Sequence, residues 1–297
     1  MLYMHPRRSY TVPLPGRPPL QLGARTLVMG ILNITPDSFA DGGVLFNDVE
    51  RAVETGVRMA AEGADILDVG GESTRPGAEP LSEKEELRRV LPVVERLARQ
   101  VQVPISIDTY KARVAREALG RGATIVNDIS GLQYDAKLGQ VVATAGAAVV
   151  LMHTRGRSIG MYDLAVYQDP AQDVTRELGE AVERAMRAGV SRDAIILDPG
   201  LGFAKRAEHS YDVLARLDTL AALDRPILSG PSRKSFLKAA IGEREPPARE
   251  WGTAAAIAAS VFFGAHIVRV HGVREMVDVV RVADRIRQSA RANPPAG

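Results

Sequence analysis

Eight short apolar runs punctuate this chain, and nearly every one ends on a polar side chain. The runs cover residues 26–33, 64–68, 104–108, 123–128, 147–153, 194–198, 226–230 and 266–271. The polar residues at their ends are Asn33, Asp68, Asp108, Asn127, Asp128, His153, Asp198, Arg269 and His271. An ionised carboxylate at the end of a buried strand is costly unless a partner compensates its charge. Repeated at strand after strand, this placement predicts one shared polar pocket.

Most of these runs are separated by segments with the apolar periodicity of a helix. The segments cover residues 48–62, 82–99, 111–120, 171–188, 208–222, 233–241, 251–263 and 273–290. Ser82 followed by Glu85 is a capping box, which fixes the start of one helix. Continuous apolar runs that alternate with amphipathic helices are typical of parallel strands covered by helices.

Eight such units without a break in composition predict an α/β fold, a single (β/α)8 TIM barrel. We expect a short irregular N-terminal arm over residues 1–25, the barrel over 26–290 and a flexible tail over 291–297. In a barrel the carboxyl ends of the strands build the active site, so the polar residues would face one mouth. The alternative fold, an open doubly wound sheet, would scatter them along an edge.

The composition argues against nucleic-acid and membrane partners and against cysteine-based sites. The 297 residues hold 38 Lys plus Arg and 36 Asp plus Glu, and this net charge of +2 gives no footprint for nucleic acid or an anionic membrane. The longest apolar stretch, residues 254–265, is too short to cross a bilayer, and the N-terminus lacks the apolar core of a secretory signal. Because cysteine is absent, disulfides, thiolate zinc sites and iron–sulfur clusters are impossible, and we expect a cytoplasmic enzyme.

The acidic and amide residues at the strand ends have structural alternatives. Asn33 could hold a hard cation or an anion, or it could cap a turn. Asp108 precedes a predicted helix and could be its N-cap. Asn127 and Asp128 are adjacent, so the alternation of a strand points one to the mouth and the other to the helix layer. Asp198 begins a Pro-Gly turn that leaves its carboxylate free.

Cationic residues follow three of the strands. The glycine-rich loop after the second strand could close over an anion through Arg75, or it could be an ordinary surface loop. The loop after the seventh strand carries Lys234 beside the positive end of a predicted helix. Arg269 and His271 lie two apart on one side of a strand and could clamp a phosphate. Alternatively, Arg269 pairs with one of the barrel's acids.

Taken in order, seven motifs resemble those of the dihydropteroate synthase family. They are GILNITPDSFADGG (30–43), DVGGESTRPGA (68–78), ISIDTYK (105–111), IVNDISG (125–131), DPGLGFAK (198–205), SRKSF (232–236) and RVH (269–271). The resemblance extends over nearly the whole predicted barrel. Departures from the family pattern are Gly272, where Asp is common, Ala204 in place of a common Gly, and Pro231 before the SRK motif.

The resemblance implies an enzyme of folate biosynthesis. It would condense 6-hydroxymethyl-7,8-dihydropterin diphosphate with 4-aminobenzoate to give 7,8-dihydropteroate and pyrophosphate. The family's reaction is SN1-like: diphosphate leaves first, with Mg2+ as the cofactor that assists it, and the arylamine then attacks. These small molecules would be the substrates, and the resemblance also implies a homodimer.

The resemblance further assigns roles to residues at matching positions. The pterin would contact Asp108, Asn127, Asp198 and Lys234. The diphosphate would contact Asn33, Thr74, Arg269 and His271, and Asn33 would also bind the metal. The aminobenzoate would contact Thr74, Arg75, Pro76, Phe203, Lys205 and Ser235. The catalytic residues would be Asp108, Asp198, Lys234 and Arg75. The two carboxylates would stabilise the cation formed on the pterin.

Three other functions use similar residues. A methyltetrahydrofolate-dependent corrinoid methyltransferase also binds a pterin, but it needs no diphosphate or aminobenzoate site, so the STRP and SRKSF segments argue against it. A Schiff-base aldolase would use Lys234 as its nucleophile, but this lysine lies at a predicted loop–helix junction and not on a strand. A non-catalytic pterin-binding paralogue would be indicated by lost lid or diphosphate residues, and here all of these are present.

Overall fold

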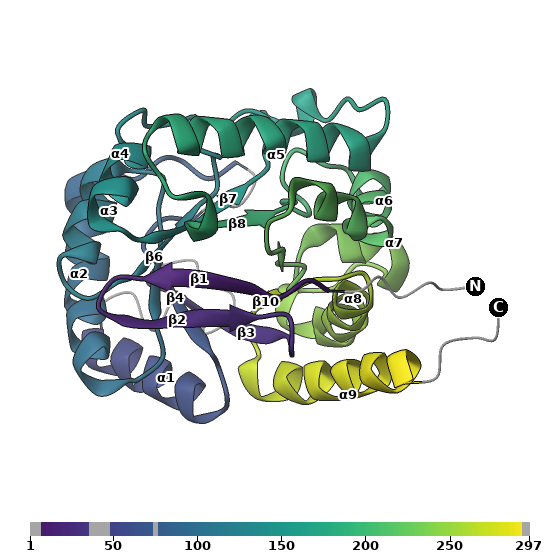
Figure 1. Cartoon of the computed structure of the whole chain (residues 1–297), viewed down its shortest axis with the longest axis horizontal. Coiled ribbons are helices and arrows are strands. Elements are labelled where there is room, and N and C mark those ends of the chain that lie inside the picture. The colour runs from purple at the N-terminus through teal and green to yellow at the C-terminus, as the bar shows by residue number, and fades with distance from the viewer. Residues whose placement is uncertain (1–6, 36–47, 74–76, 293–297) are drawn as a thin grey trace.

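In the computed structural model, residues 7–35, 48–73 and 77–292 are described, and eight parallel strands form the centre of the molecule (Figure 1). The strands are β3 (Leu27–Asn33), β4 (Ile66–Gly70), β5 (Ile105–Asp108), β6 (Ile125–Asp128), β7 (Ala148–Met152), β8 (Ile195–Asp198), β9 (Leu228–Ser229) and β10 (Ile267–Val270). Each strand overlaps one of the eight apolar runs, so these strand predictions are confirmed.

The sheet closes on itself. Its strands pair in the order β8-β7-β6-β5-β4-β3-β10-β9, and these pairs are parallel. Leu197 on β8 makes an isolated bridge with Ile227, which immediately precedes β9. The prediction of a (β/α)8 barrel is therefore confirmed, and the alternative of an open doubly wound sheet is wrong.

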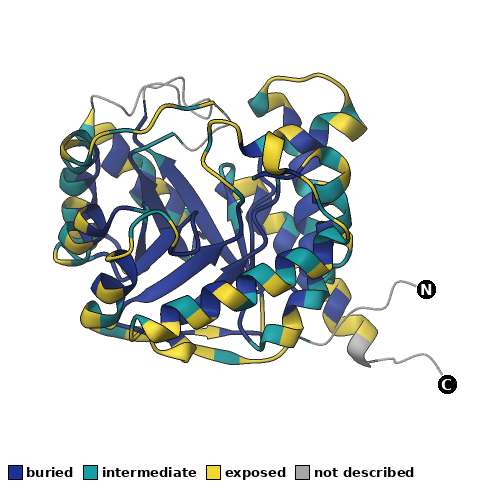
Figure 2. Cartoon of the chain, turned by 90° about the horizontal axis from the view of Figure 1, so that it is seen from above, coloured by how far each residue is buried: buried dark blue, intermediate teal, exposed yellow. Residues whose placement is uncertain are grey.

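Helices connect the strands and cover the outside of the barrel. The α-helices are α1 (Val49–Ala61), α2 (Glu83–Gln100), α3 (Ala112–Leu119), α4 (Leu138–Ala145), α5 (Pro170–Arg187), α6 (Ala207–Ala215), α7 (Lys238–Ile241), α8 (Glu250–Phe262) and α9 (Val273–Ala292). The 3-10 helices are η1 (Met161–Leu164), η2 (Arg192–Ala194), η3 (Leu217–Leu223), η4 (Ser235–Leu237) and η5 (Pro246–Arg249). Figure 2 shows buried strands enclosed by helices whose outer faces are exposed. At the start of α2 the Ser82 hydroxyl accepts from the Glu85 amide at 3.3 Å, which confirms the predicted helix start. The Glu85 carboxylate, which would complete the predicted capping box, binds Arg88 and Arg89.

Three helix predictions need correction. The sequence pattern does not predict α4, because this eight-residue helix contains Gly139 and its N-cap residue, Lys137, makes no side-chain cap. The segment predicted as one helix over 208–222 divides into α6 and η3. The segment predicted over 233–241 forms η4 and the single-turn α7, so no long helix dipole lies beside Lys234.

The N-terminal arm is not the irregular segment that its prolines predict. β1 (Tyr10–Leu14) and β2 (Arg17–Leu22) form an antiparallel hairpin that lies across one end of the barrel (Figure 1). A two-stranded sheet tolerates proline because each strand has an unpaired outer edge, and Pro13 lies where the register shifts. Gly16, with a φ of 64°, makes the turn between the strands.

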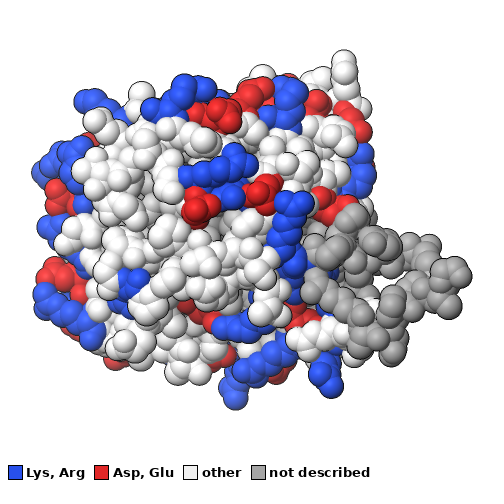
Figure 3. All heavy atoms as spheres, viewed as in Figure 1, with Lys and Arg blue, Asp and Glu red and all other residues white. Residues whose placement is uncertain are grey.

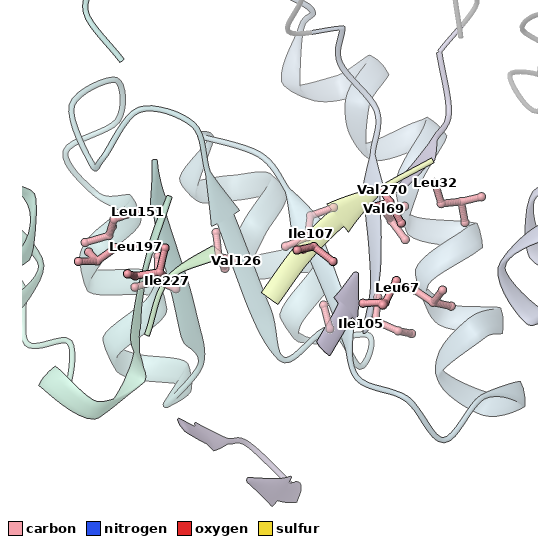
Figure 4. Close-up of a cluster of buried hydrophobic side chains, with 14 of the residues drawn as sticks. Leu32, Leu67, Val69, Ile105, Ile107, Val126, Leu151, Leu197, Ile227 and Val270 are labelled. Atoms are coloured by element: carbon pink, nitrogen blue, oxygen red, sulfur yellow. The ribbon is translucent and has the colours of Figure 1, made fainter. Parts of the chain in front are cut away.

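Side chains alternate between the two faces of each strand and so build two cores. Those that face the helices include Leu32, Leu67, Val69, Ile105, Ile107, Val126, Leu151, Leu197, Ile227 and Val270, labelled in Figure 4. Those that fill the barrel include Met29, Ile66, Ile125, Val150, Ile196, Leu228 and Ile267. The hairpin packs on this inner layer through Val12, Leu14, Leu20 and Leu22. It therefore closes the end of the barrel at which the strands begin.

The surface agrees with the small net charge. On the face shown in Figure 3, Lys and Arg are interspersed with Asp and Glu. Among the described parts of the chain, no helix combines the length and the apolar character needed to span a bilayer.

We predict that Leu22→Ala lowers the free energy of unfolding by about 2–4 kcal/mol, because it opens a cavity between the hairpin and the inner core. Leu22 is 2% exposed, whereas its neighbour Gln21 is exposed and serves as the matched control. Gln21→Ala should change the value by less than about 0.5 kcal/mol. Urea unfolding followed by circular dichroism measures both. Equal stability of Leu22→Ala and the parent would show that the hairpin adds nothing to the core.

Candidate active site

The inward positions next to the inner core are polar on five strands. They are Asp68 on β4, Asp108 on β5, Asn127 on β6, Asp198 on β8 and Arg269 on β10. On four of the strands, the residue two positions earlier belongs to the inner core. On β5 that residue is the buried Ser106. Because side chains alternate along a strand, all five point into the same mouth. The structure therefore brings together the side chains expected to share a pocket.

Arg269 lies between two carboxylates. Its Nε donates to Asp68 Oδ2 at 2.6 Å, and its Nη2 donates to Asp108 Oδ2 at 2.7 Å. The side-chain amide of Asn127 donates to the same oxygen of Asp68 at 3.0 Å. Asp68 is fully buried, and these donors to Oδ2 compensate part of the cost of burying its charge, whereas its Oδ1 has no hydrogen-bond partner within the described residues. Of the two roles considered for Arg269, the structure shows the second, in which it pairs with acids of the barrel.

The neighbouring polar residues have structural roles. Asn127 and Asp128 point to opposite sides, as predicted. Asp128 accepts from the amides of Ser130 and Leu132, at 2.8 and 2.6 Å, and so fixes the turn after β6. Asp108 is not a helix cap, since the N-cap position of α3 is Lys111.

The loop after β8 brings Asp198 and Phe203 beside Lys234. The amide of Gly200 donates to Asp198 Oδ1 at 2.7 Å. Lys234 Nζ donates to the carbonyl of Leu201 at 2.6 Å and lies 4.5 Å from the centre of the Phe203 ring. One cation and one aromatic ring thus lie together, and the buried Asp198 is near enough to act on the charge of Lys234.

Burial shifts the pKa values of these charged groups toward neutral pH. It raises the pKa of Asp108 to about 7, although Arg269 opposes the shift. It also raises the pKa of Asp198, against the opposing effect of Lys234. The pKa of Lys234 falls to about 8 because burial outweighs the attraction of Asp198. Such shifts in a cleft are typical of functional sites.

The loop after β9 holds an unusual backbone conformation. Arg233 has a φ of 58°, which is rare for a residue other than glycine. Its amide donates to Thr253 Oγ1 at 2.9 Å, and its Nε donates to Glu250 at 2.8 Å. Its carbonyl accepts from Arg249 at 2.8 Å. These bonds fix the segment that presents Lys234 to the mouth.

A cavity of about 510 Å³ opens between these groups. Seven of the predicted site residues line it: Asn33, Asp108, Phe203, Lys234, Ser235, Arg269 and His271. The lining residues for which the sequence indicates no contact include Ile31, Thr35, Glu72, Ser73, Met161, Ser232, Arg233, Lys238 and Arg249. A cavity of this size with mixed polar and apolar walls suits a small planar ligand with polar edges.

Sequence reasoning leaves two of the site's acids without a role. Asp68 ends an apolar run, and this position is the signal that could have identified it as the partner of Arg269. Glu72 lines the cavity, accepts from the Tyr110 hydroxyl at 2.9 Å and pairs with Lys111. No local pattern marks Glu72, since both partners lie in a segment almost 40 residues away.

The role predicted for Lys205 needs correction. Its side chain is 1% exposed and does not line the cavity. Its Nζ lies 2.7 Å from His153 Nδ1, behind the loop that carries Phe203. The amine is buried there because the His153 ring and two backbone carbonyls supply its hydrogen-bond partners. The remaining predicted aminobenzoate contacts, Thr74, Arg75 and Pro76, lie outside the described residues.

Asn33 is the predicted metal ligand. A Cβ built on Gly70 would lie 3.5 Å from Asn33 Oδ1 and 3.6 Å from Asp108 Oδ2, so both oxygens border one small space. Mg2+ takes oxygen ligands, with few from the protein and the rest from water and phosphates, so a single amide oxygen fits this role. Within residues 7–35, 48–73 and 77–292, no group of three or more His, Cys, Asp or Glu could hold a metal.

Comparisons with known proteins give the family. A model described as pterin binding enzyme matches residues 29–271. The dihydropteroate synthase of Synechocystis sp. is 46% identical over 275 residues, 92% of this chain and 95% of the relative.

Two solved structures have the same barrel. The Yersinia pestis dihydropteroate synthase with a sulfonamide drug complex has a TM-score of 0.88 and 40% identity, and the match covers 94% of this chain and 99% of that one. The Xanthomonas albilineans enzyme in complex with 7,8-dihydropteroate has a TM-score of 0.80 and 38% identity, over 95% and 100% of the two chains. With its polar layer, its cavity and these matches, the chain belongs to the dihydropteroate synthase family of pterin-binding transferases in folate biosynthesis.

Proposed function

We propose that this chain condenses 6-hydroxymethyl-7,8-dihydropterin diphosphate with 4-aminobenzoate to give 7,8-dihydropteroate and pyrophosphate. The observation that carries the proposal is the convergence of Asp108, Asn127, Asp198 and Lys234 at one mouth of the barrel. The Xanthomonas relative is in complex with 7,8-dihydropteroate, the product of this reaction. The methyltransferase alternative is not favoured, because the same mouth holds cations suited to a diphosphate.

The pterin would bind deep in the cavity. Its ring carries a row of N–H donors. Asp108 lines the cavity, and the buried Asn127 and Asp198 would offer an amide and a carboxylate acceptor next to it, although neither is among the residues that line it. Lys234 would donate to the oxygen and nitrogen at the other edge of the ring. Because unpaired buried carboxylates are costly, a ligand with matching donors gains from satisfying them.

The diphosphate would lie toward Arg269 and His271. The Ser232 hydroxyl lies 2.9 Å from His271 Nδ1 and helps to orient the imidazole. Since Arg269 already contacts Asp68 and Asp108, a phosphate would share the guanidinium with these acids. Mg2+ held at Asn33 would supply positive charge to the leaving diphosphate.

The aminobenzoate would lie against Phe203. Phe203 lines the cavity, and the Lys234 amine sits over the face of its ring. Ser235, the first residue of η4, would lie near the carboxylate of the substrate. Contacts with Thr74, Arg75 and Pro76 stay a prediction.

The reaction asks for positioning and electrostatics more than for covalent help from the protein. Departure of diphosphate in an SN1-like step leaves a cation delocalised over the pterin ring. Ionised Asp108 and Asp198 would stabilise this cation until the arylamine attacks. Burial raises the pKa of both carboxylates, so N–H donors of the pterin are needed to favour the charged forms.

A homodimer would form through α8 and α9. These adjacent helices carry large exposed apolar side chains, with Trp251 86%, Val282 61% and Ile286 47% exposed. Exposed apolar side chains of this size are typical of a contact surface. A cytoplasmic location stays a prediction from the cysteine-free composition.

The reaction itself is tested by release of pyrophosphate from the pterin diphosphate. We expect release to require 4-aminobenzoate and to rise when Mg2+ is added. Release that does not depend on 4-aminobenzoate would contradict the proposed condensation, and equal rates with and without Mg2+ would contradict the role of the metal.

We predict that Asp198→Asn weakens pterin binding by about 1.5–3 kcal/mol, the size of a lost hydrogen bond to a charged group. The control is Asp193→Asn, in η2 just before the same strand, where the side chain is 73% exposed. Calorimetric titration with a pterin analogue measures both affinities. If Asp198→Asn binds the analogue as tightly as the parent does, Asp198 does not hold the ring.

We predict a bell-shaped pH dependence of kcat/KM. It should fall on the acid side as Asp108 is protonated, with a pKa of about 7, and on the alkaline side as Lys234 loses its proton, with a pKa of about 8. Lys234→Arg should lack the alkaline limb, because arginine stays charged. Lys238→Arg, at the rim of the same cavity, should keep both limbs. An alkaline limb that persists in Lys234→Arg would assign it to another group.

We predict that the double substitution Val282→Asp with Ile286→Asp halves the mass measured by light scattering, because two buried charges would oppose the dimer contact. Met186→Asp is the control, since Met186 lies on α5 and is 39% exposed. A parent protein of monomer mass, or a double variant that keeps the dimer mass, would show that this face is not the interface.

A further inference from the structure

Lys205 is a buried amine that the proposed reaction does not use. Its Nζ donates to the carbonyls of Gly200 and Phe203, both at 3.1 Å, and lies 2.7 Å from His153 Nδ1. A fourth acceptor, the carbonyl of His153, lies at 3.4 Å, so each N–H of the amine finds a partner. Burial lowers the pKa of Lys205, whereas the nearby carboxylate of Asp198 raises it.

The contacts continue from Lys205 to the surface of the barrel. His153 Nε2 lies 2.9 Å from Oε2 of Glu177 on α5. Burial lowers the pKa of His153 to about 4, so at neutral pH the ring carries one N–H. With that proton on Nε2, Nδ1 accepts from Lys205. Glu177 also accepts from Arg155 Nε at 3.1 Å, so one line of hydrogen bonds joins the β7 loop, α5 and the β8 loop.

This line holds the turn after β8. The amide of Gly200 donates to Asp198 Oδ1 at 2.7 Å, while the Gly200 carbonyl accepts from Lys205. The amide of His153 donates to the Asp198 carbonyl at 2.9 Å. A Cβ on Gly200 would lie 2.0 Å from the His153 carbonyl oxygen, so the turn is pressed against the end of β7. The positions of Asp198 and Phe203 therefore depend on contacts behind the cavity wall.

We propose that Lys205 is a positioning residue: through Gly200 and Phe203 it fixes the turn that presents Asp198 to the pterin and Phe203 to the aminobenzoate. The role rests on the proposed condensation. Lys205 does not reach the cavity and acts from behind its wall, as supporting shells do in preorganised sites. His153 and Glu177 share the role because they hold the amine of Lys205.

The test compares Lys205→Met with Lys137→Met, which changes an exposed lysine just before α4. Without the amine, the carbonyls of Gly200 and Phe203 lose a buried donor, so the turn can relax. We expect the KM values for both substrates to rise about tenfold in Lys205→Met, with a smaller fall in kcat. Lys137→Met should keep the parent values. Circular dichroism establishes that each variant is folded.

A folded Lys205→Met variant with the KM values of the parent would overturn the proposal. If this variant does not fold, Glu177→Gln tests the proposal instead. It keeps an acceptor for His153 but removes the negative charge at the far end of the hydrogen bonds that join Lys205, His153 and Glu177. We expect both KM values to rise about threefold in Glu177→Gln. Its control is Glu180→Gln, one turn further along α5, where the side chain is 57% exposed. Unchanged KM values in Glu177→Gln would equally overturn the role of Lys205.

The same measurements separate this proposal from the proposed reaction. A parent protein that releases no pyrophosphate in the presence of both substrates would refute the reaction itself. An active parent with unaffected variants would refute only the role of Lys205.

Discussion

The pairing of Arg269 with Asp68 and Asp108 is the interaction on which the mouth of the barrel depends. The arginine comes from the last strand and the acids from β4 and β5, so the contact reaches across β3, the first barrel strand. Asp68 is fully buried and also accepts from Asn127. Removing one member would leave an uncompensated buried charge, at a cost of about 3–5 kcal/mol. The charges that would recognise substrate are therefore also part of what holds the strand ends together.

Space for a ligand exists because glycines stand at inward positions between these charges. A Cβ on Gly230 would lie 3.6 Å from Arg269 Cβ and 4.0 Å from Asp198 Oδ2, and a Cβ on Gly70 would face Asn33 and Asp108 at similar distances. Larger side chains there would fill the mouth, as apolar side chains fill the layer below. The same barrel thus carries a closed apolar core at one end and a cavity with polar walls at the other, because both the size and the polarity of the inward residues change between them.

The sequence predicts those parts of the molecule that local patterns determine. Apolar runs with polar ends place the strands and their inward faces, since alternation along a strand is a local property. The β1–β2 hairpin escapes prediction because its stability comes from contacts with the inner core, which its prolines do not reveal. Lys205 is misplaced for a related reason. Its burial depends on His153, 52 residues away, whereas the motif around it predicts only that it lies near the site.

The site opposes the stability of the barrel that carries it. Asp108 has a pKa of about 7 in the folded protein, above its usual value, so the folded state binds this proton more tightly. The stability that the group contributes therefore falls as the pH rises from about 4 to about 7. Lys234 has a pKa of about 8 in the folded protein, below its usual value, so its charged form destabilises the fold by a constant amount below about pH 8. This penalty decreases as the pH rises from about 8 to about 10.5. Between the two values both groups are largely charged, which the reaction requires and folding disfavours. A pterin that donates to Asp108 and accepts from Lys234 relieves both penalties, so part of its affinity comes from charges that the folded protein holds without full compensation.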